Sequence, residues 1–443
     1  MTLTDSGPRG ETGPNPREAV APRRPGTGRL RIPFNIVEEI WQLRDPPDET
    51  ANIHLEVRVS GTLDEDDIRE AIRAAVAAHP MARARKVAGR VFLRPARWEI
   101  EGPEVGDVLR SIHCDDESAL AAARVEFYDR PIGLRRAPAL RVLLVHQPGG
   151  DSLMLNAHHA ITDGVGALRL LHSVARAYSG RPDPIPPVDP LEVRDPKTFY
   201  GSATRRRFPK LEPPRTPTGA RAFIAPEGAR LGSGYGFLHV TLPAEQVRRL
   251  DPRRFEPSAT VNDLLLAALH LAIVEWNARR HHRCDCIAVF MPTNSRPPEW
   301  RDELVVNHTA GGKITSTPEQ RATSAALMAS VAEQTRWIKS GSAAAAVFDR
   351  PYWVLNLTPL LLPMISFLLG DRVENTAVLS NLGRLHEVPG FGTEAGEVTE
   401  FWFSPPCGMP MGLSVGVAAV QGRLHLAFRY RRALFDDGAA RRF

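Results

Sequence analysis

The 443-residue chain is poor in cysteine, with only four: Cys114, Cys284, Cys286 and Cys407. This number is too small for a framework of disulfides at this length, so we expect a reducing, cytoplasmic location. The segment 281–286 combines two histidines with two cysteines, but their spacing is too tight for a usual structural zinc site. We therefore expect no bound metal.

Several catalytic motifs are also missing. The sequence has no glycine-rich phosphate loop, no nucleophile elbow and no metalloprotease helix. These absences favour chemistry that needs neither a covalent enzyme intermediate nor a metal. Residues 1–28 lack the apolar stretch of a secretory signal, and their proline, glycine and charge predict a disordered tail over residues 1–30.

The balance of charge is moderately basic. With 56 lysines and arginines against 51 aspartates and glutamates, the formal net charge is +5. Such an excess fits an anionic partner such as a CoA phosphate, an acidic carrier protein or a membrane surface. We expect no nucleic-acid partner, because no base-reading motif accompanies the charge. The length suits two domains or one large two-lobed unit.

The most informative stretch is Asn156–Gly164. The apolar run 153–155 precedes it and an amphipathic segment, Val165–Tyr178, follows, which predicts a strand, a tight loop and a helix. An imidazole in the loop can take and return a proton near neutral pH. Asp163 would orient that ring, hold the loop or cap the helix, and Gly164 would allow a sharp turn or close approach of a substrate.

The pattern His158-His159-x-x-x-Asp163-Gly164 resembles the HHxxxDG signature of the chloramphenicol acetyltransferase-like superfamily. This group includes peptide-synthetase condensation domains, polyketide-associated acyltransferases and wax ester synthase/diacylglycerol acyltransferases. The resemblance implies that His159 is the general base, which deprotonates an acceptor hydroxyl or amine before it attacks an acyl thioester. It gives Asp163 a mainly structural role, salt-bridged to an arginine, while His158 and Asn156 support the site.

A second segment, His79–Arg85, is similar to the condensation-enzyme passage whose first arginine pairs with that aspartate. Carried over, this makes Arg83 the partner of Asp163, although Ala82 stands where the family has leucine. Another interpretation stays open, in which Arg83 and Arg85 belong to a solvated basic patch.

Further passages resemble the same superfamily. Residues 131–145 are similar to the passage before the active-site strand, and we expect residues 140–145 to pair with 153–156 as a hairpin. Residues 260–263 resemble an element of the wax ester synthase branch, and 377–384 resemble a Ser-Asn-Leu-Gly segment. The accessory tunnel or oxyanion candidates are Ser380, Asn381, Asn262 and Arg296. The polar residues at 260–262 would also serve as a helix cap, and those at 380–381 as turn formers.

The segment 353–369 is strongly apolar but shorter than the roughly 20 residues that a spanning helix needs. Three interpretations remain: a buried helix pair, the wall of an acyl-chain tunnel, or a monotopic membrane contact. The first is favoured as the simplest.

The resemblance implies an α/β fold with two chloramphenicol acetyltransferase-like lobes, arranged as a V around a shared active-site tunnel. We expect the lobes at residues 31–180 and 235–443, the first carrying the signature. The Pro- and Arg-rich interval 181–234 would cross between them, and its run Arg205–Arg207 would be solvated or meet phosphate.

These patterns predict a stand-alone acyltransferase that makes an ester or amide in lipid or natural-product biosynthesis. The resemblance implies no tightly bound cofactor, and an acyl-CoA or a phosphopantetheinyl carrier protein as the donor substrate. The acceptor would be a small-molecule, lipid or peptide alcohol or amine. The alternatives are a peptide-synthetase-type condensation enzyme that joins carrier-bound substrates, and a non-catalytic module that docks a carrier protein. A peripheral membrane contact is a further expectation.

Overall fold

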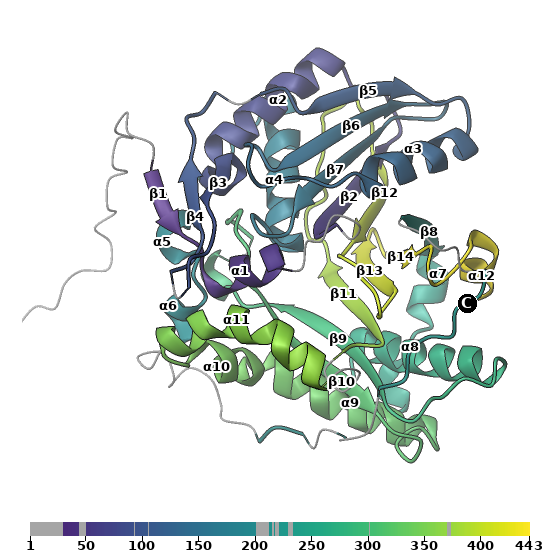
Figure 1. Cartoon of the computed structure of the whole chain (residues 1–443). Coiled ribbons are helices and arrows are strands. Elements are labelled where there is room, and N and C mark those ends of the chain that lie inside the picture. The colour runs from purple at the N-terminus through teal and green to yellow at the C-terminus, as the bar shows by residue number, and fades with distance from the viewer. Residues whose placement is uncertain are drawn as a thin grey trace, which may run out of the picture.

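The computed structural model describes residues 30–43, 50–92, 94–104, 106–200, 212–214, 217, 221–228, 234–300, 302–369 and 374–443. Apart from its last residue, the tail expected over 1–30 lies outside this range, as does the run Arg205–Arg207. Within the described residues the strands form three sheets, and helices pack against them (Figure 1). The expected α/β class is therefore confirmed.

The N-terminal sheet has the strand order β12-β2-β7-β6-β5. Helices α2 and α4 cover one face of this sheet, and α3 covers the other (Figure 1). The elements are β2 (Asn52–Val59), α2 (Glu65–Ala78), β5 (Leu109–His113), α3 (Glu117–Asp129), β6 (Leu140–His146), β7 (Ser152–His158), α4 (Gly164–Tyr178) and β12 (Val398–Ser404). The expected hairpin is confirmed, because β6 pairs antiparallel with β7.

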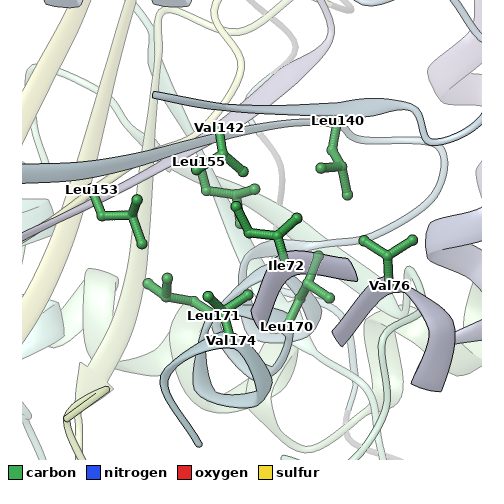
Figure 2. Close-up of a pocket in the computed structure, with 9 residues that line it drawn as sticks. All are labelled: Ile72, Val76, Leu140, Val142, Leu153, Leu155, Leu170, Leu171 and Val174. Atoms are coloured by element: carbon green, nitrogen blue, oxygen red, sulfur yellow. The ribbon is translucent and has the colours of Figure 1, made fainter. Parts of the chain in front are cut away.

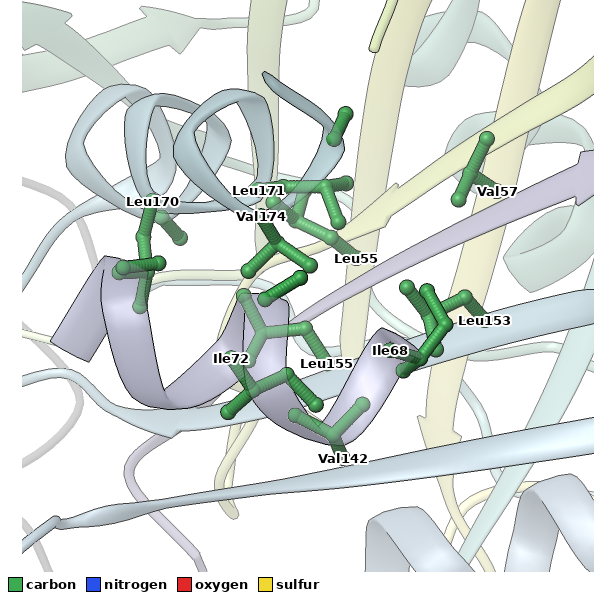
Figure 3. Packing of buried hydrophobic residues seen from close by; sticks show 14 of the residues in the cluster. Leu55, Val57, Ile68, Ile72, Val142, Leu153, Leu155, Leu170, Leu171 and Val174 are labelled. Atoms are coloured by element: carbon green, nitrogen blue, oxygen red, sulfur yellow. The ribbon is translucent and has the colours of Figure 1, made fainter. Parts of the chain in front are cut away.

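The alternation of side chains along β7 fixes the layers of this lobe. Leu153 and Leu155 pack toward α2 and α4, whereas Met154 packs toward α3. Figure 3 shows the aliphatic side chains of the first layer packing between the two helices and the sheet. A pocket in this layer is lined by aliphatic side chains alone (Figure 2). Because none of them can exchange a proton, acid–base chemistry must lie elsewhere.

The C-terminal sheet has the order β10-β9-β11-β13-β14-β8. Its strands are β8 (Tyr235–Leu242), β9 (Ile287–Asn294), β10 (Thr309–Ser316), β11 (Ala377–Arg384), β13 (Leu413–Val420) and β14 (Arg423–Arg431). Its helices are α7 (Ala244–Arg248), α8 (Val261–Ala278), α9 (Ser324–Lys339), α10 (Ser342–Phe348) and α12 (Asp437–Arg442). Helix α8 begins with the expected cap, a capping box between Thr260 and Asp263.

One strand departs from the division into lobes at residues 31–180 and 235–443. Strand β12 follows β11 of the C-terminal sheet, yet it pairs antiparallel with β2 along the N-terminal sheet (Figure 1). Phe401 and Phe403 of β12 are buried in the same cluster as Leu55 of β2. The N-terminal lobe therefore includes a segment from near the end of the chain.

Between the lobes lie a small sheet and several helices. The sheet has the order β1-β4-β3. The elements are β1 (Leu30–Pro33), α1 (Ile36–Leu43), the 3-10 turn Pro80–Arg83, β3 (Ala84–Ala88), β4 (Arg97–Ile100), α5 (Pro190–Val193), α6 (Lys197–Tyr200) and α11 (Tyr352–Leu369). A 3-10 turn at Pro252–Arg254 contacts α8, and another lies at Pro298–Trp300. Helix α1 packs against α10 and α11 through Val37, Phe348 and Leu355 (Figure 1).

The favoured interpretation of residues 353–369 as a buried helix pair is wrong. They belong to one helix, α11, whose side chains Trp353, Leu360 and Met364 are exposed. A helix packed on one side only leaves its other face in solvent, whatever its composition. Within the described residues, none of the helices is both long and apolar enough to cross a membrane.

Candidate active site

The candidate site forms where β7 gives way to α4. Strand β7 ends at His158, and α4 begins at Gly164, so the expected strand, loop and helix are confirmed. Asp163 caps the helix, since its Oδ1 accepts a hydrogen bond from the Gly166 amide at 2.8 Å. The loop therefore sits at the end of two rigid elements.

His159 lies in this loop with only 5% of its surface exposed. Its Nδ1 is 3.0 Å from the carbonyl oxygen of Thr162. Nδ1 is also 3.0 Å from the side-chain nitrogen of Asn307. The Thr162 carbonyl only accepts hydrogen bonds, so it pairs with the tautomer that carries the proton on Nδ1, whereas the Asn307 amide would donate to the other tautomer. With the proton on Nδ1, Nε2 keeps the lone pair and can act as a base.

The indole of Trp41 lies flat against the His159 ring, with the ring centroids 3.8 Å apart and the planes 20° from parallel. Trp41 comes from α1, far from the signature in the sequence. The first turn of α1 is held by two buried glutamates: Glu38 pairs with Arg194 at 2.7 Å, and Glu39 accepts from the Ala96 amide at 2.6 Å. Trp41 was not predicted from the sequence as a site residue. The available signal was the adjacent pair Glu38 and Glu39 in an otherwise apolar helix, which indicates that α1 is buried between polar partners.

Burial lowers the pKa of His159 to about 4, against the opposing attraction of Asp163. Its other titratable neighbour, His158, lowers the pKa slightly further. The imidazole is therefore neutral at physiological pH, as a general base must be before it takes a proton.

The aspartate of the signature is held by Arg296. The two side chains form a bidentate pair, with Nη1 2.8 Å from Oδ2 and Nη2 2.9 Å from Oδ1 of Asp163. Burial alone would raise the pKa of the Asp163 carboxyl, but Arg296 outweighs it and the pKa lies below its ordinary value. The His308 amide adds a further hydrogen bond to Oδ2 at 2.8 Å.

The expected pairing of Arg83 with Asp163 is therefore wrong. Arg83 ends a 3-10 turn and donates to the carbonyl of Glu101, and it is half-buried rather than enclosed. Arg85 pairs with Glu99 and Glu101 at 2.5 Å. Arg296, expected only as a tunnel or oxyanion candidate, occupies the structural position instead, because the loop after β9 is brought against the start of α4.

Asn307 and His308 connect the second lobe to the loop. The Asn307 amide donates to the carbonyl of His159, and its Oδ1 accepts from the Thr309 amide at 3.0 Å. His308 is buried, its Nε2 is 2.9 Å from the carbonyl of Val193, and burial lowers its pKa to about 3. Because the Val193 carbonyl engages its Nε2, His308 is a histidine of the lobe interface. Asn307 was not among the candidates from the sequence.

The other residues expected to support the site have structural contacts. The Nδ1 of His158 accepts a hydrogen bond from the backbone amide of Ala160 at 3.0 Å. The side-chain amide of Asn156 donates to the backbone carbonyl of Phe127, on the α3 side, at 3.3 Å. Gly164 does not need a turn conformation, since its φ is not left-handed. A Cβ there would come within 2.8 Å of the Phe403 ring, so Gly164 permits close packing of β12.

The accessory candidates form a pair of their own. Asn381 on β11 donates to Oδ1 of Asn262 on α8 at 3.1 Å, and its own Oδ1 accepts from the Gly383 amide at 2.7 Å. Ser380 is buried next to them. Within the described part of the chain, the hydrogen bonds of Asn262 and Asn381 do not reach His159. In the part of the chain that the structure describes, no three His, Cys, Asp or Glu side chains form a cluster that could hold a metal ion.

Replacing Trp41 by alanine is expected to move the acid limb of kcat/KM to higher pH. Water would then reach the imidazole, and the pKa of His159 would rise from about 4 toward its ordinary value of 6.5. Since only the neutral ring accepts a proton, activity at pH 5 relative to pH 8 should fall by roughly tenfold or more. The pH profile and an NMR titration of His159 both measure this.

Trp41→Phe is the matched control, because it keeps an aromatic ring over His159 and should leave the limb near its original position. Asp163 and His158, the titratable groups that face the ring, remain in both variants. If the acid limb of the kcat/KM profile is unchanged in Trp41→Ala, the indole does not control how much water reaches His159.

The fold is shared with condensation domains of peptide synthetases and with an O-acetyltransferase. The first condensation domain of the calcium-dependent antibiotic synthetase, in complex with a substrate analogue, aligns with a TM-score of 0.65 at 14% identity, over 93% of both chains. TRI3 trichothecene 15-O-acetyltransferase from Fusarium sporotrichioides aligns with a TM-score of 0.64 at 12% identity, over 94% of this chain and 93% of that one. A point mutant of the starter condensation domain of rhizomide synthetase RzmA, in complex with C8-CoA, gives 0.63 at 14% identity, over 92% and 91%.

The chain belongs to the same family as the uncharacterized protein Rv2305 of Mycobacterium tuberculosis. The two are 36% identical over 424 residues, which cover 91% of this chain and 94% of that protein. The hybrid PKS-NRPS synthetase lepA of Aspergillus flavus is 30% identical over 145 residues, 32% of this chain and 4% of that synthetase. No protein-family model matches the chain.

Proposed function

We propose that this protein is an acyltransferase, which moves an acyl group from a thioester to a hydroxyl or amine acceptor in natural-product or lipid biosynthesis. The observation that carries the proposal is the state of His159. Its ring is neutral and covered by Trp41, and the tautomer that donates from Nδ1 to the Thr162 carbonyl leaves Nε2 as a base. The condensation domains and the acetyltransferase of the same fold support acyl transfer as the reaction class.

In the proposed reaction, Nε2 of His159 takes the proton from the acceptor as its oxygen or nitrogen attacks the thioester carbonyl. The tetrahedral intermediate then collapses, the carbon–sulfur bond breaks, and the leaving thiolate takes the proton back from Nε2. No group of the protein is acylated. The remaining rate enhancement comes from holding both substrates at the base.

Asp163 and Arg296 serve this reaction by holding the loop rather than by exchanging protons. Their bidentate pair is buried, and the carboxylate is also bonded to the amides of Gly166 and His308. The two substrates would enter through the tunnel that the superfamily resemblance implies. The donor is the thioester of CoA or of a phosphopantetheinyl carrier, and no tightly bound cofactor takes part.

The alternative is a condensation enzyme that joins two carrier-bound substrates, which the likeness to the calcium-dependent antibiotic synthetase domain favours. Both ideas are tested by thiol release from acyl-CoAs of graded chain length and from matching acyl carrier proteins, with alcohol and amine acceptors. We expect acceptor-dependent thiol release and an acylated product by mass spectrometry. Release from CoA donors alone supports the stand-alone transferase, and release from carrier donors alone supports condensation. A folded protein that releases thiol from neither would leave only the carrier-docking module.

A further inference from the structure

Large exposed apolar side chains gather on a few neighbouring elements of the described structure. Of fifteen such side chains, nine lie on α1, α10, α11 and the hairpin between β3 and β4. They are Leu43, Val91, Phe92, Val347, Tyr352, Trp353, Leu360, Leu361 and Met364, and we call this set the apolar surface. Single exposed apolar residues are common in soluble proteins, whereas a gathering of large ones marks an interaction site.

Helix α11 contributes the longest part of this surface. Trp353, Leu360 and Met364 are 63%, 43% and 51% exposed, and their spacing of seven and four residues places them along one stripe of the helix. Leu355 lies on the opposite face, buried against α1 and α10. The sequence of α11 contains no charged residue over its 18 positions.

The hairpin contributes a protruding tip. Val91 and Phe92 are 68% and 82% exposed, and Phe92 has a positive φ of 53°. Arg90, next to the tip, donates to the backbone carbonyl of Asn356 in the middle of α11. The tip and the helix therefore adjoin one another.

Positive charge accompanies these apolar groups. The hairpin from residue 86 to residue 97 contains four cations and no acidic residue: Lys86, Arg90, Arg94 and Arg97. Arg94 and Arg97 are exposed, and Arg350 is exposed just before α11. Arg90 forms an ion pair with Glu39, at 3.5 Å. An uncharged helix beside exposed arginines is complementary to a surface that is apolar inside and anionic outside.

We propose that the apolar surface binds an anionic lipid bilayer without crossing it. Phe92, Trp353 and the stripe on α11 enter the boundary between headgroups and acyl chains, while Arg94, Arg97 and Arg350 contact anionic headgroups. A lipid surface fits better than a folded partner, because the exposed groups form a protruding tip and a convex helix rather than a groove. The inference does not depend on the proposed chemistry.

The apolar surface is connected to the candidate active site through helix α1. Helix α1 packs beneath α11, and the same helix lays Trp41 over His159. Bound lipid would therefore lie next to the element that covers the base.

Vesicle flotation tests the proposal with the intact protein. Phosphatidylcholine vesicles are compared with vesicles that also contain phosphatidylglycerol, at low and high salt. We expect the protein to float with the anionic vesicles, less so at high salt. The double variant Phe92→Ser/Trp353→Ser should bind at least about tenfold more weakly, since two large side chains no longer leave water.

The matched control is Ile185→Ser/Phe255→Ser, which removes two exposed apolar side chains outside the apolar surface and should float like the wild type. Circular dichroism confirms that both variants fold. The proposal is overturned by a folded wild type that stays with the buffer in every mixture, or by equal flotation of the two double variants. It is also overturned if Phe92→Ser/Trp353→Ser abolishes self-association or carrier-protein binding while the wild type ignores vesicles.

Discussion

Replacing His159 by alanine is expected to lower kcat/KM by about 10²- to 10⁴-fold, the usual contribution of a general base. The rate of thiol release should fall with every acyl donor that the wild type uses, because the base acts on the acceptor rather than on the acyl chain. The KM for the acyl donor should change little, because in the proposed reaction His159 contacts the acceptor. Thiol release under saturating and limiting acceptor separates these two effects.

The control for this experiment is His386→Ala. His386 is exposed, and the adjoining Glu387 pairs with Arg176 in the last turn of α4, at the opposite end of that helix from the loop. Its activity should match that of the wild type. A His159→Ala protein that unfolds at the same temperature as the wild type and keeps more than about a tenth of its activity would remove His159 as the base.

The second large effect is expected on stability. Arg296→Met should lower the free energy of unfolding by about 3–5 kcal/mol, because it leaves the Asp163 carboxylate buried without its partner. Urea unfolding measures the change. Arg83→Met is the control: it removes a half-buried side chain with a contact to one carbonyl, and should cost only about 0.5–1.5 kcal/mol. The reverse order would restore Arg83 as the important arginine.

The cost of Arg296→Met should depend on pH in a defined direction. In the wild type the folded-state pKa of Asp163 lies below its ordinary value of 3.8. The ionised carboxylate therefore contributes to the free energy of unfolding at every pH above 3.8, and this contribution is lost as the pH falls through the lowered pKa. Without Arg296, burial raises the folded-state pKa above 3.8, and protonation then favours the folded variant. The difference between wild type and variant should therefore shrink from pH 7 toward pH 4.

The sequence predicted what is local in this site. A short apolar run located β7, an amphipathic segment located α4, and the rules for helix caps explained Asp163 and the start of α8. Such features depend on residues a few positions apart, which a single sequence displays.

The parts that sequence reasoning missed depend on tertiary packing. The resemblance of segment 79–85 to a known passage predicts Arg83 as the partner of Asp163, but a loop 133 residues after Asp163 supplies Arg296 instead. Trp41 reaches His159 only because buried glutamates fix α1 between the lobes. The exposure of α11 was also unpredictable, since composition does not show which face of an apolar helix finds a partner.

Strand β12 has a consequence for how this chain acquires its structure during synthesis. The ribosome makes β2, β6 and β7 early, but the edge of their sheet stays unpaired until residues 398–404 emerge. The backbone carbonyl of Arg58 accepts a hydrogen bond from the Thr399 hydroxyl, and the Ser60 hydroxyl accepts one from the Glu397 amide. Both donors are synthesised more than 300 positions later. Contacts of such long separation form slowly, and an unpaired edge can join the wrong strand meanwhile. The nascent N-terminal half is therefore expected to need a chaperone, and separate expression of the two halves should give aggregated protein.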